Sequence, residues 1–85
     1  MTIKIAIIGA GSIGFTRRLM RDILSVPELI DSEFSFHDIN KENLEMIAQL
    51  ARRDIRANKL PAKLSTTTNR LRALEGADYV LNTTR

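Results

Sequence analysis

Three glycines near the start of the chain have the spacing of a phosphate-binding turn. Gly9, Gly11 and Gly14 follow the apolar, β-branched run of residues 3–8, and an amphipathic pattern begins directly behind them. A buried strand, a tight turn and a helix start in this order can bind the diphosphate of a dinucleotide. We predict that Gly9 permits the turn, that Gly11 leaves room for the diphosphate, and that Gly14 lets the helix pack closely on the strand.

The backbone N–H groups of Gly11, Ser12 and Ile13 are the predicted phosphate donors, because they would lie at the positive end of the helix dipole. The hypothesis requires that the space beside Gly11 be open, so that a diphosphate can occupy it. Glycines with the same spacing also occur in turns that bind nothing, and the motif alone leaves that alternative open.

Asp38 is the second residue whose type and position suit dinucleotide chemistry. Residues 33–37 are predicted to form a second strand, and Asp38 stands at its C-terminal end. A carboxylate there can accept hydrogen bonds from both hydroxyls of an adenosine ribose and repels the 2′-phosphate of NADP, so NAD is the predicted cofactor. The alternative is that Asp38 caps the following helix. His37 is interpreted as a strand residue rather than a catalyst.

The rest of the chain alternates between helical and strand patterns. Helices are predicted over about 13–26, 40–58 and 69–76, and further strands over about 62–68 and 77–82. Asn40 and Asn69 are candidate N-caps of the second and third helices. One face of the second helix is predicted to be buried, because apolar residues recur there at intervals of three and four. They are Leu44, Ile47, Ala48, Ala51 and Ile55.

The order β-α-β-α-β-α-β with right-handed crossovers predicts an α/β fold with a Rossmann-like parallel sheet, strand order 3-2-1-4. The polar run 62–68 is suited to an edge strand. The strand order reverses between the first and fourth strands, so Asn82, Thr83 and Arg85 are predicted to face Gly9 and Gly11 across a crevice. They would approach the nicotinamide side of the cofactor; the alternative is a polar loop without a ligand.

Composition excludes several other classes of function. The chain has 85 residues, a net charge of +3, one histidine and no cysteine, so the segment has no cluster of ligands for a metal. Its arginines alternate with acids on predicted helices and aromatic residues are few, which argues against nucleic-acid binding. No apolar run is long enough to cross a membrane, and no signal peptide is visible, so we expect a cytoplasmic protein that does not act at a membrane.

The length suggests part of a larger molecule. Residues 1–85 are expected to be an N-terminal NAD-binding segment, an incomplete half of its fold, with the substrate and metal domain elsewhere.

Three stretches together resemble the N-terminus of family 4 glycoside hydrolases, a group of α-galactosidases, α-glucosidases and 6-phospho-glycosidases. They are residues 5–12 with Phe15 and Leu19 behind them, Asp38-Ile39, and residues 77–83. The resemblance implies hydrolysis of an α-glycosidic bond by a redox-elimination route that uses NAD and a divalent metal, usually manganese. It also implies that Gly9, Gly11, Ser12, Asp38, Asn82 and Thr83 lie on the cofactor side.

No catalytic residue and no metal ligand can be assigned within these 85 residues. The expected partners of the full-length protein are a small α-glycoside and further copies of the same chain. Two other functions stay open at this point: an NAD-dependent dehydrogenase of the lactate or malate type, which shares the G-A-G-S turn in looser form, and an NAD-binding regulatory domain without chemistry of its own.

Overall fold

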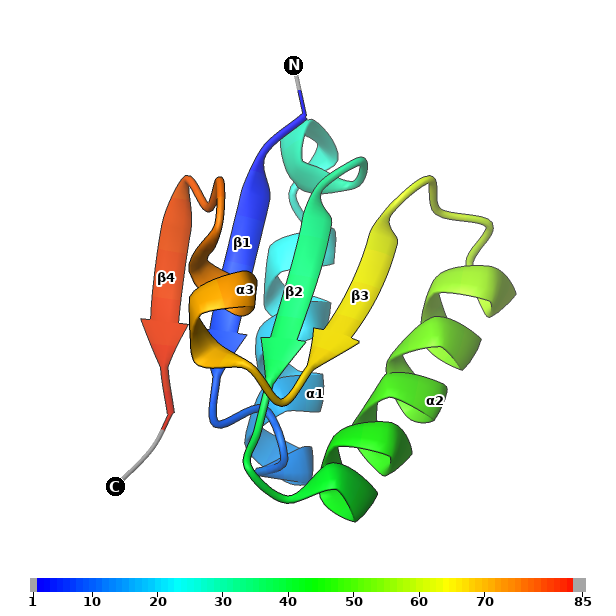
Figure 1. Ribbon diagram of the computed structural model, residues 1–85. Coiled ribbons are helices and arrows are strands. Elements are labelled where there is room, and N and C mark those ends of the chain that lie inside the picture. The colour runs from blue at the N-terminus through cyan, green and yellow to red at the C-terminus, as the bar shows by residue number, and fades with distance from the viewer. Residues whose placement is uncertain (1, 84–85) are drawn as a thin grey trace.

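The computed structural model describes residues 2–83, which form strands and helices in the predicted alternating order (Figure 1). The strands are β1 (Lys4–Ile8), β2 (Glu33–His37), β3 (Lys63–Thr67) and β4 (Tyr79–Asn82). The helices are α1 (Ile13–Leu24), α2 (Lys41–Ala57) and α3 (Arg70–Leu74), with a short 3-10 helix η1 (Pro27–Leu29) in the connection between α1 and β2.

The four strands form one parallel sheet in the order β3-β2-β1-β4, which confirms the predicted topology and the edge position of β3. In the register, Ile8 of β1 lies opposite His37 of β2 and Asn82 of β4. The C-terminal ends of these strands therefore meet at one edge of the sheet, the lower edge in Figure 1.

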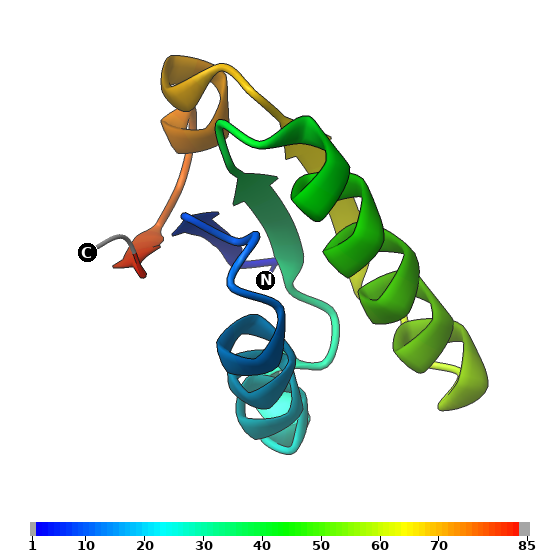
Figure 2. The same cartoon turned by 90° about the horizontal axis from the view of Figure 1, so that it is seen from below.

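Helices cover both faces of the sheet. The view onto the lower edge in Figure 2 shows α1 and α2 on one side and α3 on the other. The main core lies on the α1–α2 side, where Phe34 and Phe36 of β2 are fully buried with Ile7 and Ile47. Burying large apolar side chains is the dominant stabilising term in such a layer.

The predicted apolar face of α2 is confirmed, since all five of its residues are buried. Helix α1 is less regular: its buried residues are Met20 and Thr16, and the Thr16 hydroxyl donates a hydrogen bond of 2.8 Å to the carbonyl of Ala10. Arg17 of α1 and Asp54 of α2 form an ion pair of 3.3 Å. Because both side chains are partly solvated, this pair stabilises the fold by at most about 1 kcal/mol.

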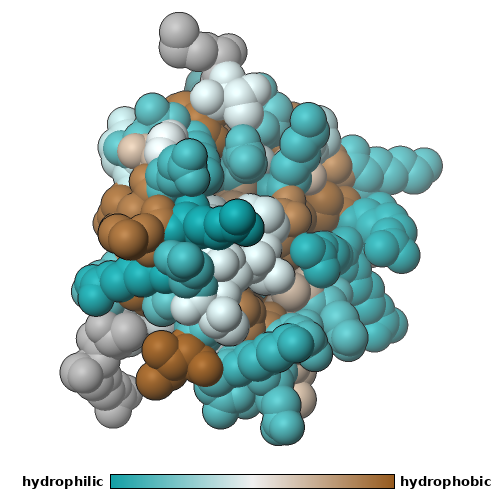
Figure 3. Space-filling model, in the orientation of Figure 1, coloured by the Kyte–Doolittle hydropathy of each residue, from teal (hydrophilic) through white to brown (hydrophobic). Residues whose placement is uncertain are grey.

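The α3 face of the sheet is more polar. Side chains alternate along a strand, so Ser35 and His37 lie on the opposite face of β2 from Phe34 and Phe36. Figure 3 shows this side of the molecule as largely hydrophilic, with apolar patches toward β4. Among the helices within residues 2–83, none is both long and apolar enough to cross a lipid bilayer.

Candidate functional site

The turn after β1 is fixed by the end of β2. The N–H groups of Gly9 and Ala10 both donate to the carbonyl oxygen of His37, each at 2.8 Å. Gly9 has a φ of 84°, a conformation that strains residues with a side chain. The predicted role of Gly9 in the turn is thus confirmed. We call residues 9–12 the glycine turn.

Gly11 contacts Asp38 directly. Its N–H donates a hydrogen bond of 2.7 Å to Oδ2 of Asp38. A Cβ atom at Gly11 would lie 2.5 Å from that oxygen, 2.9 Å from Cγ of Asp38 and 3.0 Å from Cβ of Asn43. The expectation that this space is open to a diphosphate is therefore wrong, because the protein's own atoms fill it. Glycine is required at this position by the carboxylate beside it.

The predicted phosphate donors also need correction. The N–H of Gly11 is bound to Asp38, and the N–H of Ser12 donates to the carbonyl of Gly9 at 3.2 Å. The N–H groups of Ile13 and Gly14, in the first turn of α1, meet no acceptor within residues 2–83. Of the three predicted donors, only Ile13 is free to bind an anion, and Gly14 joins it.

The start of α1 is open in two further respects. Ser12 is the N-cap residue, but its side chain makes no capping hydrogen bond, and the first turn contains no acidic residue. No side chain of α1 itself therefore neutralises the positive end of the helix dipole, and the negative charge at its entrance comes from Asp38, which is bound to the Gly11 N–H. The free N–H groups of Ile13 and Gly14 can still donate to an anion.

The predicted packing role of Gly14 is wrong. A Cβ atom at Gly14 would meet nothing within 4 Å in residues 2–83, and the residue is exposed. Helix α1 approaches β1 without needing a glycine at this point, because the contact is made by other side chains such as Met20.

Asp38 lies at the end of β2 with each carboxylate oxygen bound to one backbone donor. Oδ2 accepts from Gly11, and Oδ1 accepts from the N–H of Asn40 at 2.8 Å. The alternative that Asp38 caps α2 is wrong, because the cap is Asn40, whose side chain accepts from the N–H of Asn43 at 3.0 Å. Each carboxylate oxygen can still accept a second hydrogen bond, which leaves Asp38 able to receive two hydroxyl groups.

Ile39 is a further residue at this edge. The sequence indicates it only as part of the family resemblance and does not predict it as a site residue. It follows Asp38 directly and is 90% exposed. An apolar side chain beside a carboxylate suits a ligand that combines a planar base with a sugar. The available signal was a large apolar residue at the end of a strand, between two polar residues and outside the helical pattern.

Thr83 lies against the other side of the glycine turn. Its N–H donates to the carbonyl of Ile8 at 2.8 Å, and its hydroxyl lies 2.7 Å from the carbonyl oxygen of Gly9 and 3.0 Å from that of Ile8. The structure thus brings together all seven predicted cofactor-side residues at one edge of the sheet. They are Gly9, Gly11, Ser12, Ile13, Asp38, Asn82 and Thr83. Arg85 lies outside the described residues.

His37 is part of β2, as predicted, and is buried. Its Nδ1 atom meets no hydrogen-bond partner within residues 2–83, while its carbonyl holds the glycine turn. The structure therefore gives this residue a backbone role in the site. Residues 2–83 contain no group of three or more histidine, cysteine, aspartate or glutamate side chains that could bind a metal ion.

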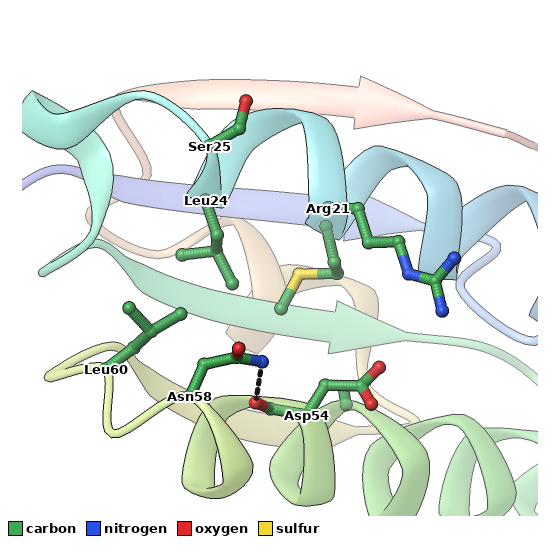
Figure 4. A pocket seen from close by; sticks show the side chains of 8 residues that line it. Arg21, Leu24, Ser25, Asp54, Asn58 and Leu60 are labelled. Atoms are coloured by element: carbon green, nitrogen blue, oxygen red, sulfur yellow. Dashed lines mark hydrogen bonds between the residues drawn. The ribbon is translucent and has the colours of Figure 1, made fainter.

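A groove of about 240 Å³ between α1 and α2 lies away from this edge (Figure 4). It is lined by Met20, Arg21, Leu24, Ser25, Ala51, Asp54, Asn58 and Leu60. Asn58 donates a hydrogen bond of 2.8 Å to the carbonyl of Asp54 at its rim. The groove is at the C-terminal ends of both helices, where the dipole disfavours anions. The candidate dinucleotide site is therefore the glycine turn and Asp38.

Two curated proteins are similar to nearly the whole chain. An α-galactosidase of Rhizobium meliloti (strain 1021) is 55% identical over 82 residues, which are 96% of this chain and 17% of that protein. An α-glucosidase of Erwinia rhapontici is 37% identical over 81 residues, which are 95% of this chain and 18% of that protein. The chain thus spans less than a fifth of the length of these relatives.

The sequence profile described as family 4 glycosyl hydrolase matches residues 4–85, which include every element of the sheet and the whole candidate site. The predicted resemblance to family 4 glycoside hydrolases is thereby confirmed. This chain belongs to the family 4 glycosyl hydrolases.

Proposed function

We propose that this chain is the NAD-binding segment of an enzyme that hydrolyses α-glycosidic bonds, in α-galactosides or α-glucosides. Membership of the family and the similarity to an α-galactosidase and an α-glucosidase support the reaction and the substrate class. One observation supports the cofactor most directly: the uncapped start of α1 lies beside a carboxylate that still has acceptor capacity.

The residues present fit the two polar parts of NAD. Because Asp38 fills the space beside Gly11, the diphosphate would not rest there as the sequence predicted. The N–H groups of Ile13 and Gly14 would hold it instead, further along α1. The carboxylate of Asp38 would receive the hydroxyls of the adenosine ribose. The exposed side chain of Ile39 would lie beside the adenine. Asn82 and Thr83, at the end of β4, would lie toward the nicotinamide.

When bound, NAD would accept a hydride from the sugar and later return it. The residues of this segment would bind and orient the cofactor, and none of them is assigned a proton transfer. The divalent metal, manganese in this proposal, would be held by residues outside the segment, since residues 2–83 offer no ligand cluster. We therefore expect the 85-residue segment alone to show no turnover of nitrophenyl α-glycosides.

The cofactor is tested with Asp38→Ala in the full-length protein that carries this segment. Loss of a charged hydrogen-bond acceptor should weaken NAD binding roughly tenfold or more, equivalent to about 1.5–3 kcal/mol. NADP should be weakened less, because the variant also loses a charge that repels the 2′-phosphate. Isothermal titration with both dinucleotides measures the two effects, and Glu45→Ala, an exposed acid on α2, serves as control.

Equal losses for NAD and NADP would remove Asp38 from the ribose site. The reaction itself is tested separately, by incubating the full-length protein with nitrophenyl α-galactoside or α-glucoside, NAD and manganese. Release of nitrophenol that depends on NAD supports the glycosidase. Net accumulation of NADH from a hydroxy acid, without glycoside cleavage, would identify a dehydrogenase instead.

A further inference from the structure

The glycine turn is bound to the end of β2 by three successive backbone donors. The N–H groups of Gly9 and Ala10 donate to the His37 carbonyl, and the N–H of Gly11 donates to the Asp38 side chain. The first two bonds need only the backbone of β2. The third depends on one side chain, so it is the bond that a substitution can remove.

The contact between Gly11 and Asp38 is close and specific. The acceptor is a carboxylate, so the 2.7 Å bond to the Gly11 N–H is charge-assisted. The second oxygen of the same carboxylate is bound to the N–H of Asn40, which fixes the orientation of the group. There is no room for a side chain at Gly11, because a Cβ atom would lie 2.5 Å from Oδ2.

We propose that Asp38 is a positioning residue for the glycine turn: by holding Gly11, it sets the direction in which the free N–H groups of Ile13 and Gly14 point. The ligand assigned to those groups rests on the proposed function, but the contact itself does not. If a ribose binds the same carboxylate, one side chain then joins the sugar-binding and phosphate-binding parts of the site. Occupancy of one part thereby orders the other.

Backbone amide exchange in the NAD-free, full-length protein tests the contact without any ligand. In Asp38→Ala, the Gly11 amide, followed within a peptide covering residues 9–13, should exchange roughly tenfold faster or more, because the charge-assisted bond that protects it is lost. Asp38→Asn keeps one carbonyl acceptor and should restore part of the protection. A peptide covering residues 44–55 of α2 should exchange as in the wild type, which shows that the effect is local.

A double-mutant cycle tests the same contact through stability. Gly11→Ala should lower the melting temperature of the NAD-free protein by several degrees, because its Cβ displaces the carboxylate. In the Asp38→Ala background the same substitution should cost clearly less, with the contact to Asn43 remaining. Gly14→Ala is the matched control within the same motif. It should hold or raise the melting temperature in both backgrounds, because its Cβ meets nothing.

Unchanged exchange of residues 9–13 in Asp38→Ala would overturn the proposal, and so would an equal cost of Gly11→Ala in both backgrounds. Either result could occur while Asp38→Ala still weakens NAD binding, in which case Asp38 acts on the ribose alone. Conversely, the full-length protein could fail to bind NAD in titration while Asp38→Ala still speeds the exchange of the Gly11 amide. The titration would then reject the proposed cofactor, and the exchange would support the positioning role.

Discussion

Two helices begin at the same edge of the sheet, and they begin differently. At α2, the side chain of Asn40 accepts from the N–H of Asn43, and Glu42 adds a negative charge to the first turn. At α1, Ser12 makes no capping bond and the first turn has no acid. The first turn of α2 is thus capped by a side chain directly before it, whereas the first turn of α1 has no side-chain cap.

The third helix shows that α1 is the exception among the three α-helices of residues 2–83. The side chain of Asn69 accepts from the N–H groups of Leu71 and Arg72 at the start of α3. A missing cap costs typically about 1 kcal/mol of stability. In the proposed function, the uncapped N–H groups at the start of α1 are the ones that the diphosphate would use.

Closing the start of α1 is expected to have the largest effect. Ser12→Asp should stabilise the NAD-free protein by about 0.5–1.5 kcal/mol, because the new carboxylate caps the helix and complements its dipole. The same charge would face the diphosphate, so NAD affinity should fall roughly tenfold or more. Thermal unfolding without NAD and titration with NAD measure the two opposite changes.

Ser12→Asn separates the cap from the charge. It should stabilise the helix to a similar extent and reduce NAD affinity less than the aspartate does. If Ser12→Asp left NAD affinity unchanged, the diphosphate would not lie at the start of α1, and the contrast between the two helices would have no functional meaning.

Opening the start of α2 is expected to have an intermediate effect. Asn40→Ala removes the acceptor of the Asn43 N–H and should lower the free energy of unfolding by about 1 kcal/mol. NAD affinity should change little, since the backbone N–H that Asn40 donates to Asp38 remains. Urea unfolding and NAD titration are the measurements; a loss of affinity as large as that of Asp38→Ala would show that the two helix starts act as one site.

The smallest effect is expected at α3. Asn69→Ala removes a cap of the same type, but α3 has only five residues and packs mainly through Ala73. We expect a loss of about 0.5 kcal/mol or less, at the lower end of the range for caps. Comparison of urea midpoints for Asn40→Ala and Asn69→Ala tests this order, which a larger loss at α3 would reverse.

Most of the fold was predictable because its signals are local or periodic. The spacing of Leu44, Ile47 and Ile55 predicts the buried face of α2, and Asn40 and Asn69 precede their helices as caps do. Alternation of strands with helices then leaves few parallel arrangements. Thr16 was not predicted in the core, because its burial depends on a hydrogen bond to Ala10 that the pattern of apolar residues does not indicate.

The candidate site was predictable as a set of residues but not as a set of contacts. The glycine spacing and an acid at the end of the second strand predict which residues meet at the edge of the sheet. They do not predict that Gly11 faces a carboxylate rather than a ligand, or that Gly14 faces open space. The first fact depends on the pairing of β1 with β2, which brings Asp38 to the glycine turn.

By itself, the sequence determined the order of the elements, the buried face of α2, the caps of α2 and α3 and the residues at the carboxyl edge. These properties follow from the chemistry of near neighbours and from the regular period of helices and strands. Only the tertiary structure decided which N–H groups of the glycine turn are free. That choice depends on Asp38, which lies 27 residues from Gly11 along the chain and reaches it only because β1 and β2 are paired in register.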